Sequence, residues 1–277
     1  MSFLDKNPNI IREIVEVSKD AGKSILDIYN SSNRDFELKE DRSPLTQADI
    51  SSNTIIVDSL KKLTPKIPIL SEEDSNITFK ERSNWKRYWL IDPLDGTKEF
   101  INRNGEFTTN IALISNNKPI LGVIYIPVLD KIYWGAKNKG SYSINSEGKT
   151  TQINTSKNNG KKMRIVASRS HYNKKLNPIL NSIRNYKIIN VGSSLKFCSV
   201  ASGSADLYIR LGPTAEWDTA AGEAILSFAG GSIVNFNGAG MQYNKSKSLL
   251  NPDFIASNDK ITSQNILKLI NENNRDN

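Results

Sequence analysis

The chain has 277 residues, of which 38% are hydrophobic and 24% are charged, and its formal net charge is +8 at pH 7. This composition is typical of a globular protein of one or two domains and excludes a disordered chain. The positive charge favours anionic partners, for which nucleic acid, a membrane surface and a phosphorylated metabolite are all candidates. Because Lys and Arg are spread along the whole chain, we attribute the charge mainly to a general compositional bias.

Cysteine content and apolar runs indicate the cellular compartment. Cys198 is the only cysteine, so no internal disulfide can form, and we expect this residue to be a small member of the core. Residues 1–8 lack the layout of a signal peptide, and the longest apolar run, 119–129, is too short to span a bilayer. We therefore predict a cytoplasmic protein without integral membrane contact. Peripheral association with the inner membrane and the oligomeric state stay open.

The first half of the chain combines two helical patterns with a run of strand patterns. Apolar residues recur every three or four positions over 10–29 and 49–63, which predicts two amphipathic helices, and Pro65 ends the second. From position 67 the pattern becomes that of strands, which we expect at 67–70, 87–91, 107–114, 120–126 and 131–136. This order predicts an α+β half, with helices on one face of a mainly antiparallel sheet.

A polar stretch over 154–162 separates this half from a second one in which strands and helices alternate. We expect strands at 164–167, 187–190, 205–209, 232–235 and 254–256, and helices at 174–183, 194–201, 215–229 and 261–270. The alternation predicts an α/β layer structure. We therefore predict two subdomains, 1–153 and 163–277.

The most informative motif is Asp92-Pro-Leu-Asp-Gly-Thr97, which directly follows a predicted strand. Pro93 stiffens the turn that holds Asp92 and Asp95, and Gly96 lets the chain bend away. Carboxylates at a rigid strand end suit hard divalent cations. We also expect a short helix to begin after Gly96, where free N–H groups would attract a phosphate.

Three further patches place carboxylates at the ends of predicted elements. Asp49 lies at the start of a helix, Glu72 follows a strand, and Asp218 lies near the start of another helix. Each residue has an ordinary alternative role. Asp49 could form a capping box with Thr46, Glu72 could lie in a solvated turn, and Asp218 could be an acid favoured by the helix dipole. Together they could converge with the first motif around two Mg²⁺ ions, which lie about 3.5–4 Å apart in such sites. Without metal their mutual repulsion would be costly.

The second half offers groups for binding an anion. Ser168 and His171 follow a predicted strand, and Arg210 ends another. The segment 191–196 places a Gly-Ser-Ser turn and Lys196 before a helix, which could form a phosphate cradle or an ordinary loop. His171, the only histidine, could equally be a polar surface residue. Neither a P-loop nor a dinucleotide-binding glycine motif is present in the sequence.

These motifs resemble those of the lithium-sensitive, Mg²⁺-dependent phosphatases of the inositol monophosphatase superfamily. Segments 92–100, 104–108 and 192–198 are especially similar to those of bacterial 3′(2′),5′-bisphosphate nucleotidases, which act in sulfur assimilation. The resemblance covers about residues 10–255 and leaves out the final helix. It implies a layered α/β/α/β/α sandwich and hydrolysis of adenosine 3′,5′-bisphosphate to AMP and phosphate, with 3′-phosphoadenylyl sulfate as a second substrate.

The resemblance also implies roles for individual residues, most metal ligands lying in the first predicted subdomain. Two or three Mg²⁺ ions would be held by Glu72, Asp92, the Leu94 carbonyl, Asp95 and Asp218. Asp49 and Thr97 would orient and deprotonate the attacking water. The substrate would contact Leu94, Asp95, Gly96, Thr97, His171, Ser193, Lys196, Arg210 and Asp218.

Three alternatives remain beside this interpretation. A phosphatase of the same superfamily could act on inositol or sugar phosphates, although Lys196 and Arg210 favour a nucleotide with two phosphates. A haloacid-dehalogenase-type phosphatase would form an aspartyl-phosphate, but its acids are two positions apart, whereas Asp92 and Asp95 are three apart. A nucleic-acid-binding protein lacks support, since the sequence contains no recognised binding motif. We therefore expect a small nucleotide bisphosphate, and no nucleic acid polymer, as the partner.

Overall fold

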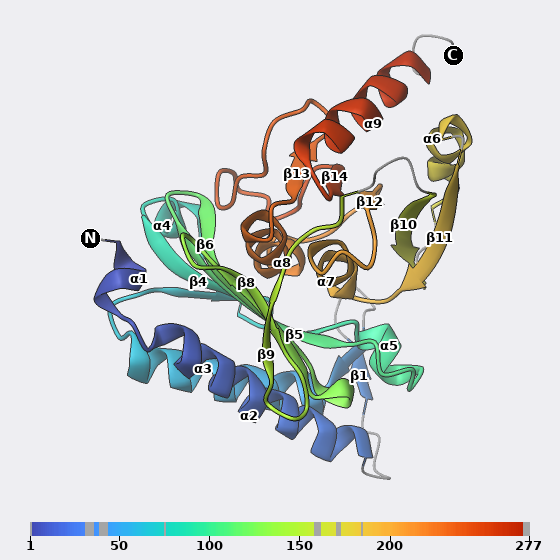
Figure 1. The fold of residues 1–277 in the computed structure, drawn as a ribbon. Helices are drawn as coiled ribbons and strands as arrows, with labels where there is room; N and C mark the ends of the chain where they lie inside the picture. The colour runs from blue at the N-terminus through green and yellow to red at the C-terminus, as the bar shows by residue number, and fades with distance from the viewer. Residues whose placement is uncertain are drawn as a thin grey trace.

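A seven-stranded sheet forms the centre of the first half (Figure 1). The computed structural model describes residues 2–30, 36–38, 44–74, 76–157, 162–169, 173–183 and 185–273. In chain order, which is also the order across the sheet, the strands are β3 (Ile69–Ser71), β4 (Arg87–Asp95), β5 (Thr108–Ser115), β6 (Lys118–Ile126), β7 (Lys131–Ala136), β8 (Gly140–Ile144) and β9 (Thr150–Ile153). All neighbours except β3 and β4 are antiparallel, as predicted.

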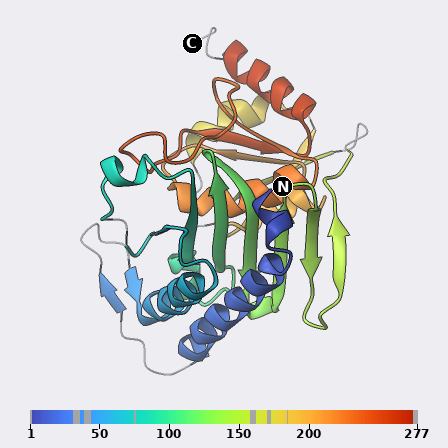
Figure 2. The same cartoon turned by 90° about the vertical axis from the view of Figure 1, so that its left-hand side faces the viewer.

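Helices cover both faces of this sheet, not one face as the sequence analysis predicted (Figure 2). Helices α2 (Ile10–Asn30) and α3 (Gln47–Leu63) cover one face, and α8 (Glu216–Phe228), from the second half, covers the other. Close approach is possible because β6 and β7 carry glycines there. A Cβ atom at Gly122 would lie 2.4 Å from the Ala221 carbonyl oxygen, and one at Gly135 would lie 2.7 Å from Ile225 Cα.

The second half contains a five-stranded mixed sheet of order β11-β10-β12-β14-β13. Its strands are β10 (Met163–Ser168), β11 (Tyr186–Val191), β12 (Leu207–Arg210), β13 (Ser232–Asn235) and β14 (Phe254–Ser257). Helices α7 (Leu195–Ala201) and α8 pack on one face, and α6 (Asn177–Ser182) and α9 (Lys260–Asn273) on the other. The layers are therefore α/β/α/β/α, which confirms the predicted fold class.

Short elements complete the chain. They are α1 (Phe3–Lys6), the strand pair β1 (Phe36–Leu38) and β2 (Pro44–Thr46), α4 (Phe79–Arg82), α5 (Thr97–Ile101), and two 3₁₀ turns, η1 (Pro127–Leu129) and η2 (Lys174–Leu176). The helix predicted at 174–183 thus begins as a 3₁₀ turn. The short helix expected after Gly96 is α5, and this prediction is confirmed.

Strand β4 extends beyond its predicted end at residue 91 and reaches Asp95. Its register against β5 shifts between Asp92 and Asp95, where Pro93 cannot donate a ladder hydrogen bond. Gly96 then adopts φ +91° and α5 begins. The candidate metal-binding motif is therefore an irregular strand end followed by a helix start, both fixed by the sheet.

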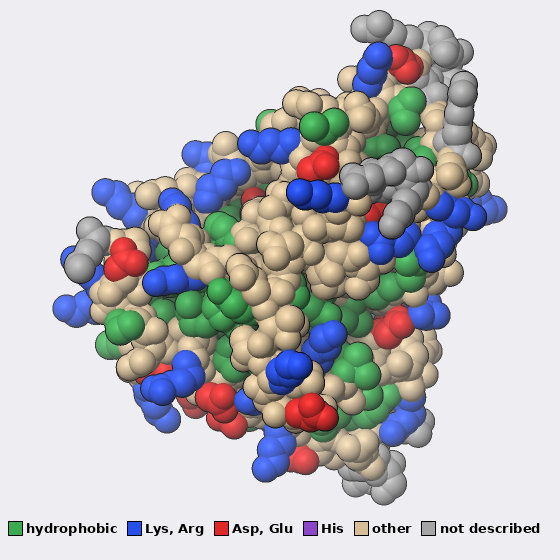
Figure 3. All heavy atoms as spheres, viewed as in Figure 1, with side chains coloured by type: hydrophobic (Ala, Val, Ile, Leu, Met, Phe, Trp, Pro, Cys, Tyr) green, Lys and Arg blue, Asp and Glu red, His purple; other side chains and the backbone are tan. Residues whose placement is uncertain are grey.

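The core and the surface agree with the expectations for Cys198 and for charge. Cys198 is buried in the core between the two sheets, as predicted. On the face drawn in Figure 3, Lys and Arg side chains are scattered over both halves among Asp and Glu.

Among the described helices, we find none with the length and apolar character needed to cross a bilayer. The proposed subdomains, 1–153 and 163–277, each contain one large sheet, but their boundary stays a prediction because α8 packs on both sheets.

Candidate active site

The end of β4 forms the base of the candidate site. Asp92 is 2% exposed, and its Oδ1 accepts a hydrogen bond from the Leu94 N–H at 3.1 Å. The Pro93 carbonyl accepts a hydrogen bond from the Ser52 hydroxyl of α3 at 2.8 Å. Asp92 also lies opposite Asn110 in the register of β4 and β5. The strand end is therefore held from both the helix layer and the sheet.

Three other carboxylates come from separate elements. Asp49 is 1% exposed in the first turn of α3. Glu72 follows β3, and its backbone N–H donates to the Ile91 carbonyl at 3.1 Å. Asp218 lies in the first turn of α8, where its Oδ2 accepts from the Ala215 N–H at 2.9 Å. Asp218 thus caps the first turn of α8, and the same residue also lines the cleft.

These carboxylates are close enough to affect one another's ionisation. Burial raises the pKa of Asp92 well above its usual range, and the charges of Glu72, Asp95, Asp218 and Asp49 raise it further. Burial, followed by the charges of Asp95 and Glu72, likewise raises the pKa of Asp218. A cation among these groups would relieve both the repulsion and the desolvation. The oxygen donors therefore fit a hard divalent cation.

The carboxylates are not yet arranged as a finished coordination shell. Within the described residues, no three His, Cys, Asp or Glu side chains are grouped tightly enough to hold a metal ion as they stand. Protein donors occupy two of the candidates, because Asp95 accepts hydrogen bonds from Ser193 and Ser194, and Asp218 accepts one from Ala215. These hydrogen bonds do not block metal binding, because carboxylates that ligate a metal also accept hydrogen bonds.

The turn before α7 contacts the β4 motif directly. Asp95 Oδ2 accepts hydrogen bonds from the Ser193 hydroxyl at 2.6 Å and the Ser194 N–H at 2.7 Å. The Gly192 N–H donates to Glu106 Oε2 at 2.7 Å. Two backbone donors of the possible phosphate cradle thus already bind carboxylates, which the sequence analysis did not foresee.

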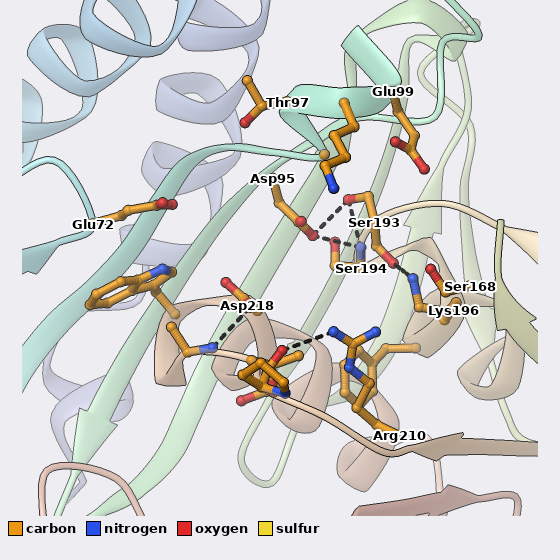
Figure 4. Close-up of a pocket in the computed structure, with 18 of the residues that line it drawn as sticks. Glu72, Asp95, Thr97, Glu99, Ser168, Ser193, Ser194, Lys196, Arg210 and Asp218 are labelled. Atoms are coloured by element: carbon orange, nitrogen blue, oxygen red, sulfur yellow. Dashed lines mark hydrogen bonds between the residues drawn. The ribbon is translucent and has the colours of Figure 1, made fainter. Parts of the chain in front are cut away.

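Two cationic side chains lie on the same wall as this turn (Figure 4). Lys196 is 6% exposed, and its ammonium group donates to the Ser193 carbonyl and lies 5.5 Å from the centre of the Tyr208 ring. Burial lowers the pKa of Lys196 to about 8. Arg210 ends β12, and its Nη2 donates to the Pro213 carbonyl at 2.9 Å. Its Nε is buried without a hydrogen-bond partner among the described residues.

A cleft of about 630 Å³ separates the carboxylates from the cations. Of the predicted site residues, it is lined by Glu72, Asp95, Gly96, Thr97, Ser193, Lys196, Arg210 and Asp218. Asp49, Asp92 and Leu94 are buried and do not line it. In Figure 4, Glu72, Asp95 and Asp218 face Lys196 and Arg210. His171 lies outside the described residues.

The structure also adds site residues that the sequence analysis did not select. Trp217, which precedes Asp218, and Ser194, which lies inside segment 192–198, both line the cleft. Leu250 lines it too, and no local signal marks this residue because it is far from the others in sequence. Asn110 donates to Asp95 Oδ2 at 3.4 Å, a contact that depends on the register between β4 and β5.

Comparisons with known proteins identify relatives over almost the whole chain. The model of the inositol monophosphatase family matches residues 7–275. The 3′(2′),5′-bisphosphate nucleotidase CysQ of Salmonella typhimurium is 44% identical over 246 residues, which cover 88% of this chain and 98% of that protein. The corresponding protein of Buchnera aphidicola is 42% identical over 264 residues, covering 93% of this chain and 98% of the relative.

Solved structures are similar over the same range. The crystal structure of CysQ from Bacteroides thetaiotaomicron, a bacterial member of the inositol monophosphatase family, has a TM-score of 0.80 at 37% identity. It covers 90% of this chain and 97% of that one. The suhB protein of Bartonella henselae has a TM-score of 0.77 at 26% identity, with 94% and 98% covered. The family match includes α9, so the expectation that the final helix lies outside the resemblance was wrong.

Proposed function

Because this chain belongs to the inositol monophosphatase family, we infer that it is a 3′(2′),5′-bisphosphate nucleotidase, a phosphoric monoester hydrolase. It converts adenosine 3′,5′-bisphosphate to AMP and phosphate and takes 3′-phosphoadenylyl sulfate as a second substrate. The observation that carries this inference is the 44% identity to the Salmonella nucleotidase over 98% of that protein. The cleft supports it, since carboxylates face Lys196 and Arg210 across a space suited to a substrate with two phosphates.

Mg²⁺ dependence is typical of this family. We propose that two or three ions are held by the side chains of Glu72, Asp92, Asp95 and Asp218 and by the Leu94 carbonyl. When bound, Mg²⁺ neutralises phosphate charge and activates a water for in-line attack. The burial and mutual repulsion of Asp92 and Asp218 support this assignment, because they leave these carboxylates in need of a counter-charge.

Asp49 and Thr97 are the proposed pair that acts on the attacking water. Thr97 lines the cleft at the first position of α5, where its hydroxyl is suited to orienting a water. Asp49 is buried at the start of α3, and we assign to its carboxylate the acceptance of the proton. The N–H groups of Gly96 and Thr97 are proposed to donate hydrogen bonds to the transferred phosphate. Leu94 and Asp95, which precede them, are proposed to contact the substrate as well.

The nucleotide side of the cleft is proposed to hold the phosphate that is not transferred. Ser193, Lys196 and Arg210 supply a hydroxyl and two cations there, and His171 completes the predicted set outside the described residues. A phosphate would compensate the desolvated ammonium of Lys196 and offer an acceptor to the buried Nε of Arg210. The expected partner is thus a small nucleotide bisphosphate, and the cytoplasmic location stays a prediction.

A substrate panel tests this function against its nearest alternative. We expect kcat/KM for phosphate release, measured with Mg²⁺, to be much higher for adenosine 3′,5′-bisphosphate than for inositol 1-phosphate or a sugar phosphate. Much faster cleavage of inositol 1-phosphate would contradict the nucleotidase assignment. Trapping of a phosphorylated Asp92 after acid quench would contradict direct attack by water.

A further inference from the structure

Glu106 has no role in the mechanism above, yet its carboxylate is one of the most fully bonded groups near the cleft. Arg169, just after β10, donates its Nε to Oε2 and its Nη2 to Oε1, both at 2.7 Å. The Gly192 N–H, just after β11, donates to Oε2 at 2.7 Å. Arg169 Nη2 also donates to the Asn190 carbonyl at 2.9 Å. Glu106 therefore connects the first half of the chain to the ends of two strands of the second sheet.

The Gly192–Ser194 turn is held from two sides by these contacts. Glu106 binds its first residue, and Asp95 binds the Ser193 hydroxyl and the Ser194 N–H. The turn is also tightly packed, because a Cβ atom at Gly192 would lie only 3.0 Å from the Glu106 carbonyl oxygen. Ser193 itself has φ +49°, a conformation that non-glycine residues rarely adopt without outside support.

The two supports differ in what else they must do. Asp95 is a proposed metal ligand, whereas Glu106 is not among the charges that raise the pKa of Asp92 and does not line the cleft. Burial alone would raise the pKa of Glu106, but the hydrogen bonds from Arg169 and Gly192 outweigh burial and lower the pKa. Its carboxylate is therefore charged at neutral pH and remains available to hold the turn.

We propose that Glu106, oriented by Arg169, is a positioning residue that fixes the Gly192–Ser194 turn. This inference rests on the proposed nucleotidase function. The turn carries Ser193, and the Ser193 carbonyl accepts a hydrogen bond from the Lys196 ammonium group. Displacement of the turn would therefore move Ser193 and Lys196, two of the groups that are proposed to hold the phosphate that is not transferred. Substrate binding should suffer more than the chemical step.

The test uses Glu106→Gln and Arg169→Lys, with Asp206→Asn as a matched control. A glutamine cannot reproduce all three hydrogen bonds: with its oxygen in the place of Oε2, its amide N–H group faces Arg169 Nη2, donor against donor, and the negative charge that attracts Arg169 is lost. Arg169 is 46% exposed, so Arg169→Lys should fold even if the first variant does not. Asp206 accepts hydrogen bonds from Nε and Nη2 of Arg164 at 3.0 and 2.7 Å. This is the same type of two-pronged pair as Glu106 with Arg169, but it lies at the other end of β10.

We expect Glu106→Gln to raise KM for adenosine 3′,5′-bisphosphate about tenfold and to change kcat less than about twofold. Arg169→Lys should raise KM by a smaller factor, because lysine keeps the charge but loses the two-pronged geometry. Asp206→Asn should lower Tm without changing KM. A raised KM in the Glu106 and Arg169 variants, beside a lowered Tm at constant KM in the Asp206 variant, would distinguish a positioning role from a general effect on stability.

A lowered Tm with an unchanged KM in Glu106→Gln would overturn the inference, as would a fall in kcat at constant KM. Those results would leave the nucleotidase function intact, provided that the wild-type enzyme hydrolyses the bisphosphate. An inactive wild-type enzyme would instead overturn the proposed function and this inference together.

Discussion

Asp92 is buried at the end of β4 beside the other proposed metal ligands, so its replacement tests their shared role. We expect Asp92→Asn to lower kcat by at least about 100-fold, because one charge that holds Mg²⁺ is lost. The Leu94 N–H can still donate to the asparagine oxygen, and repulsion within the cluster falls. The variant should therefore keep its Tm in EDTA, and it should lose the rise in Tm that Mg²⁺ gives the wild-type protein. Appreciable residual activity would refute the proposed role.

Lys196 gives a prediction about pH, since burial lowers its pKa to about 8. The side chain is charged below this pH and neutral above it, so attraction for the substrate weakens as pH rises through 8. We expect KM of the wild-type enzyme to rise over this range. Lys196→Ala should raise KM at pH 7 about tenfold, with a smaller change in kcat, and should abolish that pH dependence.

Lys196→Arg is the control for charge, because an arginine stays protonated throughout. Its KM should not follow the transition near pH 8. An unchanged KM with a lowered kcat in Lys196→Ala would count against a binding role.

At this scale the sequence predicted residue types better than their contacts. Carboxylates at element ends could be recognised as candidate ligands, and the resemblance supplied their roles. The contacts of Asp95 with Ser193, Ser194 and Asn110 could not be predicted, since they depend on strand register and on how the halves of the chain meet. For the same reason Glu106 lay in a quoted motif without an assigned role.

At the scale of elements, helix α8 contains a buried acid outside the cleft. Glu223 is 6% exposed, its Oε2 accepts from the Tyr243 hydroxyl at 2.6 Å, and burial raises its pKa to about 7. Because this pKa exceeds the unfolded value of 4.5, the group contributes stability that is fully present below about pH 4.5. That contribution is lost as pH rises through about 7.

Glu223→Gln should therefore stabilise the protein at pH 8, by roughly 1–3 kcal/mol, and have little effect at pH 4.5. Urea unfolding at the two pH values measures the difference. Glu272→Gln on α9 is the control, since that carboxylate is 53% exposed and should change little. Equal or lower stability of Glu223→Gln at pH 8 would contradict the burial argument.

Gly122 tests the close packing of β6 against α8. Gly122→Ala would place a Cβ atom 2.4 Å from the Ala221 carbonyl oxygen, so strand and helix must separate. We expect a loss of about 1–3 kcal/mol of unfolding free energy. The value of kcat/KM should also fall, because α8 carries Asp218.

Gly240→Ala is the matched control, because its nearest neighbour is the flexible end of Lys118 at 3.2 Å. It should leave both quantities nearly unchanged. Equal effects of the two substitutions would show that the contact with α8 is not the cause.

Element prediction succeeded where periodicity was strong. The long helices α2 and α3 and the apolar strands β5 to β7 follow the expected patterns closely. Strands β8 and β9 were missed because they are short and largely polar, and β9 lies at the sheet edge with three of its four residues exposed. The extension of β4 was missed because Pro93 usually ends a strand.

At the scale of the whole molecule, the cleft takes one wall from each half of the chain. The order of elements predicted an α+β first half and an α/β second half, and the family resemblance implied the five layers. Elementary patterns could not predict that α8 packs on both sheets. The small residues of α8 indicate that another element packs closely against this helix. They do not show that the contact is made by glycines 122 and 135 of the first sheet.

Mg²⁺-dependent hydrolysis of a nucleotide bisphosphate is the most direct test of this arrangement. The measurement is the rate of phosphate release from adenosine 3′,5′-bisphosphate by the wild-type enzyme, with Mg²⁺, after chelation by EDTA, and after Mg²⁺ is restored. We predict rapid release with Mg²⁺, loss of activity in EDTA and recovery on restoration. Release at the same rate in EDTA, or no release with Mg²⁺, would contradict the assignment of the carboxylate cluster as a metal-dependent catalytic site.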